Sequence, residues 1–171
     1  LPTDGIVKET ADRITAGHEG EEAKARAIYD WVVDNTIYDP SLPGCGTGDV
    51  RRQLISGQYG GRSADINGLF VAICRAVGIP ARCVYGLRTG SSRLFRNLGI
   101  AGDDASRGQH VRAEFYVPGY SWVPVDFAPA GGCHCHQYPD RLHETHSFVQ
   151  EALYPCLQTE TGTRSTMNPH C

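Results

Sequence analysis

The chain has 171 residues, with 16 lysine and arginine residues against 19 aspartate and glutamate residues, which gives a formal net charge of −3. This length suits a single domain, and the basic residues form no dense stripe of the kind that a nucleic acid or an anionic membrane surface requires. No apolar run approaches the ~18 residues that span a bilayer. Composition therefore excludes nucleic-acid binding and a membrane span, and indicates an ordinary globular domain.

The first part of the chain has the apolar spacing of helices. Apolar residues at helical intervals predict helices over about 6–14 and 21–34. After a loop rich in helix breakers, Asp49 is placed to cap a short helix that presents Leu54 and Ile55. We therefore expect three helices in this region.

A fourth helix has the clearest pattern in the sequence. Its core-facing stripe consists of Ile66, Leu69, Phe70, Ile73 and Val77. Gly78 and Pro80 supply the signals that end a helix. Gly60 and Gly61 come just before it, so the chain is expected to turn sharply and to place Ser63 at or beside the helix N-terminus.

Beyond this helix the apolar period changes to two. Alternation predicts strands over Ala81–Leu87, 111–117 and 122–127, the last two forming a hairpin. A long polar loop, 89–108, separates the first strand from the hairpin. Helices followed by antiparallel strands predict the α+β class.

Three residues combine into a predicted nucleophilic site: Ser63 at the helix start, His110 entering a strand and Asp126 leaving the next strand. A helix N-terminus favours negative charge on a nucleophile, histidine can act as its general base, and a carboxylate can orient the histidine. Taken singly, each residue has a structural explanation, as a helix cap, a hydrogen-bonded strand histidine and a surface carboxylate. All three in this order favour a catalytic triad.

The hairpin register decides whether the last two residues meet. A three-residue loop over 117–119 would pair Tyr116 with Tyr120 and put His110 directly opposite Asp126, whereas a two-residue loop would put them on opposite faces. The Pro-Gly pair suits a type II turn, which two-residue hairpins disfavour, so we expect the longer loop.

Several motifs resemble the transglutaminase-like superfamily, over roughly residues 1–128. They are YGGRSADIN at 59–67, RAVGIPAR at 75–82, QHVRAEFY at 109–116 and GYSWVPVD at 119–126. The resemblance implies a papain-like core, with a helix that bears a catalytic cysteine packed on an antiparallel sheet that bears histidine and aspartate. It also implies amide-bond hydrolysis or acyl transfer on a peptide or protein substrate, without a cofactor, and it slightly favours the bacterial cell envelope or secretion as the location.

Ser63 departs from this family, because it occupies the position of the nucleophilic cysteine. A thiol beside histidine at a helix N-terminus ionises near neutral pH, whereas a serine hydroxyl does not. Three explanations are open, in this order of preference: an engineered serine that inactivates the enzyme, a natural pseudo-enzyme, or a genuine Ser-His-Asp hydrolase. A rival hypothesis is a non-catalytic domain that keeps the cleft to bind a peptide or a partner.

Other polar and thiol residues near this site have open roles. Gln58 is a predicted oxyanion donor alongside the Ser63 backbone N–H, and an exposed loop amide is an equally good interpretation. Cys74 lies three turns along the helix and is expected in the core. For Cys45, a free thiol and a disulfide both remain open.

The last quarter of the chain, 129–171, loses periodicity and leaves the family pattern. Four of its residues have the chemistry of zinc ligands: Cys133, Cys135, His143 and His146. Their spacing is tighter than in common zinc sites, so we prefer a poorly ordered or extraneous tail. We therefore expect a catalytic core over 1–128, followed by a tail without a dependable function, and the sequence leaves the oligomeric state open.

Overall fold

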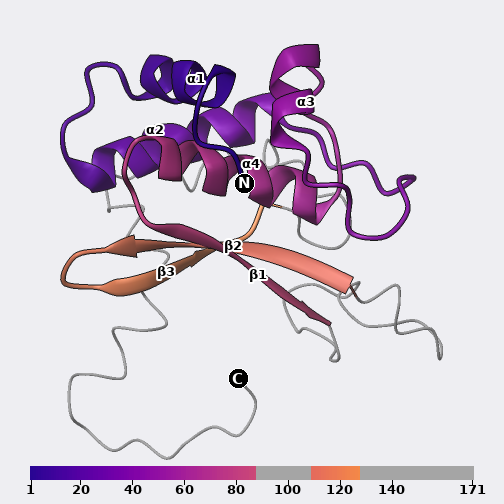
Figure 1. The fold of residues 1–171 in the computed structure, drawn as a ribbon. Helices are drawn as coiled ribbons and strands as arrows, with labels where there is room; N and C mark the ends of the chain where they lie inside the picture. The colour runs from indigo at the N-terminus through magenta and orange to yellow at the C-terminus, as the bar shows by residue number, and fades with distance from the viewer. Residues whose placement is uncertain (88–108, 128–171) are drawn as a thin grey trace, which may run out of the picture.

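The computed structural model describes residues 1–87 and 109–127, which form a layer of helices on one face of a three-stranded antiparallel sheet (Figure 1). The elements in chain order are α1 (Ile6–Thr15), α2 (Gly20–Asn35), α3 (Val50–Ser56), α4 (Ser63–Ala76), β1 (Ala81–Leu87), β2 (Gln109–Val117) and β3 (Ser121–Val125). The predicted α+β class is confirmed. Within the described ranges, no helix has both the length and the apolar character needed to cross a membrane.

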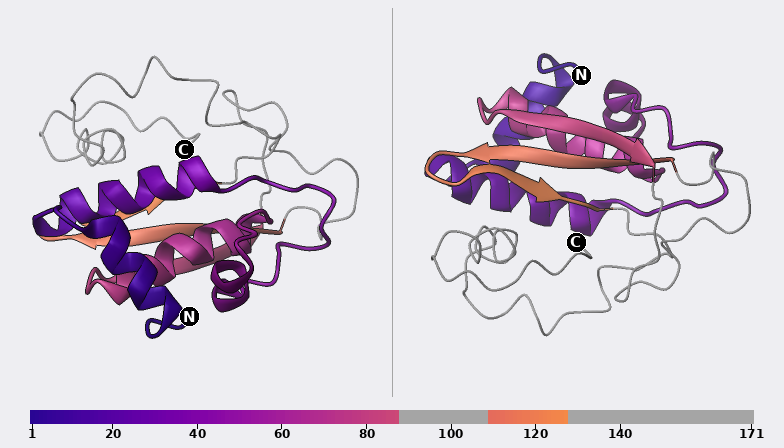
Figure 2. Two further views of the ribbon diagram at one scale, coloured as in Figure 1. Left: turned by 90° about the horizontal axis from the view of Figure 1, so that it is seen from above. Right: turned by 90° about the horizontal axis from the view of Figure 1, so that it is seen from below.

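Helix α4 lies at the centre of the molecule. It packs against β1 and β2 on one side and against α1 and α2 on the other (Figures 1 and 2). Of its residues, only Arg75 is exposed. The prediction of a single core-facing stripe was therefore too narrow, because α4 is buried all round, as helices between two layers are. Val77, the last residue of that stripe, follows the helix and is half-buried.

Helix α3 has the predicted cap, and it buries one of its two predicted apolar residues. The Asp49 side chain accepts a hydrogen bond from the Arg52 N–H at 3.1 Å, and Gly57 follows the helix in a left-handed conformation. Leu54 is 6% exposed, whereas Ile55 is 73% exposed. Of the two residues that the helix was predicted to present, only Leu54 is therefore buried, because adjacent helical residues point about 100° apart.

The β2–β3 hairpin turns through the Pro-Gly pair as expected. The Tyr120 N–H donates to the Val117 carbonyl at 3.0 Å, and Gly119 has φ 87°, as the third position of a type II turn requires. The loop has three residues, but Val117 pairs with Ser121 across it. The loop therefore lies one residue later than predicted.

This later loop changes the register by two residues. Tyr116 pairs with Trp122 rather than with Tyr120, so His110 and Asp126 are not directly opposite one another, as predicted, but diagonal. A shift of two residues keeps each side chain on its original face of the sheet. The two side chains can therefore still meet.

Three phenylalanines anchor the strands that carry the site. Phe70 of α4 contacts Phe115 of β2, with ring centroids 5.9 Å apart, and Phe127 at 5.1 Å. Phe127 also contacts Tyr29 of α2 at 5.0 Å. Because Phe127 is buried and directly follows Asp126, this packing fixes the end of the hairpin where the carboxylate lies.

Candidate active site

Ser63 is the first residue of α4 rather than its cap. Arg62 holds the N-cap position, and its backbone N–H donates to the Asp65 carboxylate at 2.8 Å. Ser63 is only 3% exposed. The sequence prediction that this residue lies at the helix N-terminus is therefore confirmed, and its interpretation as a capping serine is wrong.

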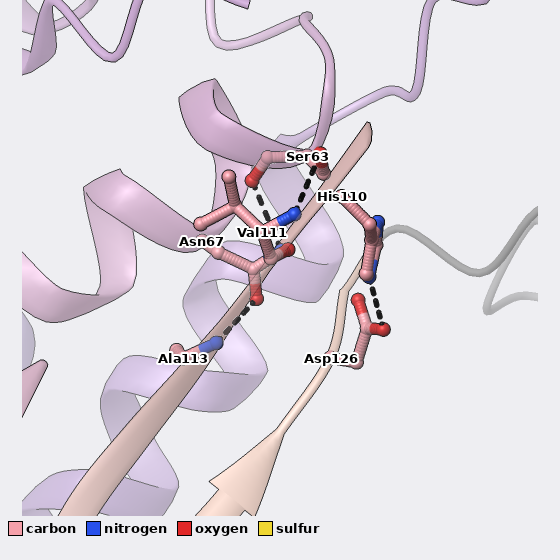
Figure 3. Close-up of polar contacts among 6 residues, drawn as sticks. All are labelled: Ser63, Asn67, His110, Val111, Ala113 and Asp126. Carbon is pink, nitrogen blue, oxygen red and sulfur yellow. Dashed lines mark hydrogen bonds and ion pairs between the residues drawn. The ribbon is translucent and has the colours of Figure 1, made fainter. Parts of the chain in front are cut away.

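The Ser63 hydroxyl lies against the start of β2. Its Oγ accepts a hydrogen bond from the Val111 N–H at 3.2 Å, and Val111 directly follows His110 (Figure 3). This contact joins the first turn of α4 to the strand that carries the histidine. It also gives the hydroxyl oxygen a backbone donor, which favours negative charge at this atom.

His110 and Asp126 form a close polar pair. Nε2 of His110 lies 2.6 Å from Oδ2 of Asp126 (Figure 3), and the two side chains are 14% and 36% exposed. A carboxylate on Nε2 holds the ring orientation and stabilises a positive imidazolium.

Asn67 ties these parts together, and the sequence interpretation missed it. Fully buried one turn after Ser63, its Nδ2 donates to the Ser63 carbonyl at 3.0 Å and to the Val111 carbonyl at 2.9 Å. Its Oδ1 accepts from the Ala113 N–H at 3.2 Å (Figure 3). The only available signal was a polar residue inside an apolar helix, which also fits an exposed position.

Among the described residues, most backbone N–H groups in the first turn of α4 have acceptors. The Ala64 N–H donates to the Cys45 carbonyl at 2.7 Å, and the Asp65 and Ile66 N–H groups both donate to Arg62. In the described part of the chain, the Ser63 N–H has no acceptor. This donor is therefore suited to a negatively charged oxygen.

Gln58 is not brought to Ser63 by any hydrogen bond between described residues. It is exposed, and it lines a hollow of about 340 Å³ that Ser63 does not line. Gly60 and Asp65, which flank Ser63 in the sequence, form part of the same hollow. The role of Gln58 as an oxyanion donor therefore stays a prediction.

The cysteines of the described ranges are all free thiols: Cys45, Cys74 and Cys83. Complete burial raises the pKa of the Cys74 thiol far above its ordinary value, which agrees with its predicted place in the core. Burial also raises the pKa of Cys83, against a smaller opposing effect of the Arg75 charge. Neither thiol has the low pKa of a catalytic nucleophile.

The predicted zinc ligands lie outside the described residues, as do the loop 89–108 and the tail 129–171. Those ligands are Cys133, Cys135, His143 and His146. Within 1–87 and 109–127, no group of three or more histidine, cysteine or acidic side chains is placed to hold a metal ion.

The match to known families covers most of the chain and includes the whole site. The family model described as the transglutaminase-like superfamily matches residues 8–127, which contain Ser63, His110 and Asp126. The chain belongs to the transglutaminase-like superfamily. The resemblance inferred from the sequence motifs is therefore confirmed.

Relatives of this superfamily member are longer proteins. An uncharacterised protein of Haemophilus influenzae is 44% identical over 139 residues, which are 75% of this chain and 37% of that protein. Two solved structures share the fold. A proposed cysteine protease of Cytophaga hutchinsonii has a TM-score of 0.53 at 23% identity, over 72% of this chain and 37% of its own. The periplasmic domain of TgpA from Pseudomonas aeruginosa has a TM-score of 0.54 at 21% identity, over 74% and 44%.

Proposed function

We propose that this transglutaminase-like domain is built for amide-bond hydrolysis or acyl transfer, with residue 63 as the nucleophile position, His110 as the base and Asp126 as its orienting carboxylate. The observation that carries the proposal is the 2.6 Å contact between His110 Nε2 and Asp126 Oδ2, beside the N-terminus of the helix that begins with Ser63. The proposal further assigns the native chemistry to a cysteine at residue 63 and little activity to the serine form.

The proposed reaction has two steps. In the first, the thiol of a cysteine at residue 63 transfers its proton to His110, and the sulfur attacks an amide carbonyl carbon whose oxygen is stabilised by the residue 63 N–H. His110 gives the proton to the departing amine, and a thioester remains. In the second step, water or another amine loses a proton to His110 and attacks the thioester, which releases the acyl group and restores the thiol.

Serine at this position is expected to be a poor nucleophile. Its hydroxyl does not ionise near neutral pH, so attack depends on proton removal in the same step. The oxygen is also smaller than sulfur, and misplacement by about 1 Å can cost roughly 10²-fold in rate.

A second function, peptide binding without catalysis, is favoured by one observation. The Ser63 Oγ already accepts a hydrogen bond from the Val111 N–H, so the hydroxyl has a structural role in joining α4 to β2. A domain of this kind would bind a peptide at the same site and leave it intact. The two functions predict different behaviour for the Ser63→Cys variant: turnover of a bound peptide in one case, and binding without turnover in the other.

The Ser63→Cys variant tests the proposal. We expect it to turn over peptide amides, with or without an added amine, and Ser63→Cys/His110→Asn to be slower by about 10²–10⁴-fold, the usual contribution of a general base. Ser56→Cys, which adds a thiol to an exposed helix end, is the matched control and should stay inactive.

Two results would overturn the proposal. An inactive Ser63→Cys that binds peptides would favour the non-catalytic function. Equal turnover by Ser63→Cys with and without His110 would remove the histidine from the mechanism.

A further inference from the structure

Asp65, two residues after the nucleophile position, lies at the centre of a network that holds the chain around it. This residue is only 5% exposed. Oδ1 accepts hydrogen bonds from the Thr47 and Gly48 N–H groups, both at 2.8 Å, and from Thr47 Oγ1 at 3.1 Å. Oδ2 accepts from the Arg62 N–H at 2.8 Å. One carboxylate therefore joins the loop before α3 to the N-cap of α4.

Two glycines make room for this carboxylate. A Cβ at Gly46 would lie 2.6 Å from Asp65 Cγ, and a Cβ at Gly61 would lie 2.6 Å from Asp65 Oδ2. Both distances are far shorter than the separation that a carbon atom keeps from a non-bonded atom in a protein. The backbone at Gly46 and Gly61 therefore approaches Asp65 more closely than a residue with a side chain at either position would allow.

The loop 45–48, which Asp65 binds, determines which backbone N–H at the N-terminus of α4 is left without an acceptor. Its Cys45 carbonyl accepts from the Ala64 N–H at 2.7 Å, while the Ser63 N–H has no acceptor in the described ranges. Without the loop, both N–H groups would be open, and an incoming oxygen would have two alternative places. The loop thus directs an oxyanion to the N–H of the nucleophile residue itself.

The charge of Asp65 works against the proposed nucleophile. Asp65 lies two residues after residue 63, and a like charge nearby disfavours ionisation of a thiol. Its benefit to the site must therefore come from its hydrogen bonds. Charge-assisted bonds to backbone N–H groups are among the stronger ones in proteins.

We propose that Asp65 is a positioning residue that docks the 45–48 loop on α4 and thereby fixes the nucleophile and its oxyanion donor. The inference rests on the proposed function. It predicts that replacing Asp65 lowers the rate of the chemical step even though the replacement removes an unfavourable charge. An effect through charge alone has the opposite sign.

The test compares Ser63→Cys with Ser63→Cys/Asp65→Asn. Asparagine cannot accept from both the loop and the Arg62 N–H, because one of its two positions is a donor. We expect kcat to fall by about 10²-fold, in line with a misplacement of roughly 1 Å, with KM nearly unchanged. The pH profile of iodoacetamide alkylation, mapped to residue 63 by peptide mass, separates this effect from the charge.

Two control variants make the result interpretable. Asp49→Asn removes a carboxylate next to the same loop and keeps a good helix cap, so it should leave kcat unchanged. Thr47→Ala removes the 3.1 Å bond from Thr47 Oγ1 to Asp65 and the 3.4 Å bond that the same Oγ1 accepts from the Asp49 N–H, and it keeps both backbone donors to Asp65. It should show a smaller loss of kcat even if Asp65→Asn fails to fold.

The outcomes distinguish the two proposals. If Ser63→Cys is neither alkylated rapidly nor active, the proposed function fails and the inference fails with it. If Ser63→Cys is active and Asp65→Asn raises its alkylation rate near neutral pH with kcat equal or higher, the function stands and the positioning role is wrong. The positioning role is equally wrong if Asp65→Asn is unfolded and Thr47→Ala keeps full kcat.

Discussion

Replacing Asn67 with leucine removes the side chain that fixes α4 to β2. Leucine has a similar size, so the change leaves the packing volume nearly constant and acts on the hydrogen bonds. The Ser63 and Val111 carbonyls lose a donor, and the Ala113 N–H loses an acceptor. All three contacts lie in the buried interior next to the site.

The expected loss follows from these three bonds. A buried hydrogen bond contributes about 1 kcal/mol net to stability, and a polar group left without a partner costs about 1–3 kcal/mol. The free energy of unfolding of Asn67→Leu should therefore fall by about 3 kcal/mol. This is a large part of the 5–15 kcal/mol that is typical of a whole domain.

Urea unfolding followed by circular dichroism measures this change. With a slope of about 1–3 kcal/mol per M, the midpoint should fall by roughly 1–3 M. Asn35→Leu is the matched control, because the Asn35 side chain lies exposed at the end of α2 and donates only to the Trp31 carbonyl. Its midpoint should barely move. A loss below 1 kcal/mol for Asn67→Leu would show that the helix and strand are held by apolar packing alone.

Three further predictions concern the core, a close approach and a thiol. Leu54→Ala should lower the free energy of unfolding by about 2–4 kcal/mol in urea melts, whereas replacing the exposed Ile55 with alanine should change it by less than ~0.5 kcal/mol. Equal effects would contradict the burial of Leu54 and the exposure of Ile55. Gly61→Ala forces a Cβ against Asp65 and should lower the free energy of unfolding by about 1–3 kcal/mol, whereas a Cβ at Gly86 meets no atom within 4 Å and Gly86→Ala should be near neutral. A neutral Gly61→Ala would refute the close approach to Asp65. Because burial raises the pKa of Cys74, its thiolate fraction at pH 8 is far below that of an ordinary thiol, and iodoacetamide should label it only after urea unfolds the chain. Rapid labelling of Cys74 in the native protein, detected by peptide mapping, would contradict its burial.

The elements that carry the site could be predicted because their signals are local. Gly60 and Gly61 before an apolar helix placed Ser63 at its N-terminus, and Gly78 with Pro80 marked its end. The strands followed from apolar alternation, and the turn type followed from the Pro-Gly pair. In each case a few neighbouring residues determine the backbone conformation.

The hairpin register could not be predicted, because it depends on an unusual backbone conformation. Ser121 has φ 75°, a left-handed conformation that residues with a side chain rarely adopt, and it pairs with Val117 directly after the turn. The prediction that His110 and Asp126 share a face survived only because the error was an even number of residues.

The roles of Asp65 and Asn67 also depend on distant parts of the chain. Asp65 has one local partner in Arg62, and Asn67 has one in Ser63. Their other partners lie 17–18 and 44–46 residues away in sequence, so neither spacing nor propensity could indicate them. Periodicity treats a polar residue on a helix as a sign of exposure, whereas both are buried. The proposed boundary between the core, 1–128, and the tail, 129–171, stays a prediction.

Mass spectrometry of a trapped acyl-enzyme tests the central claim most directly. The Ser63→Cys variant is mixed with an amide acyl donor, quenched in acid, digested and analysed, with the unmodified Ser63 protein treated in parallel. We predict an added acyl mass on the peptide that contains residue 63, at a yield that falls sharply when His110 is replaced. An acyl group found instead on another cysteine, such as Cys45, or none under conditions of turnover, would contradict a thioester at the N-terminus of α4.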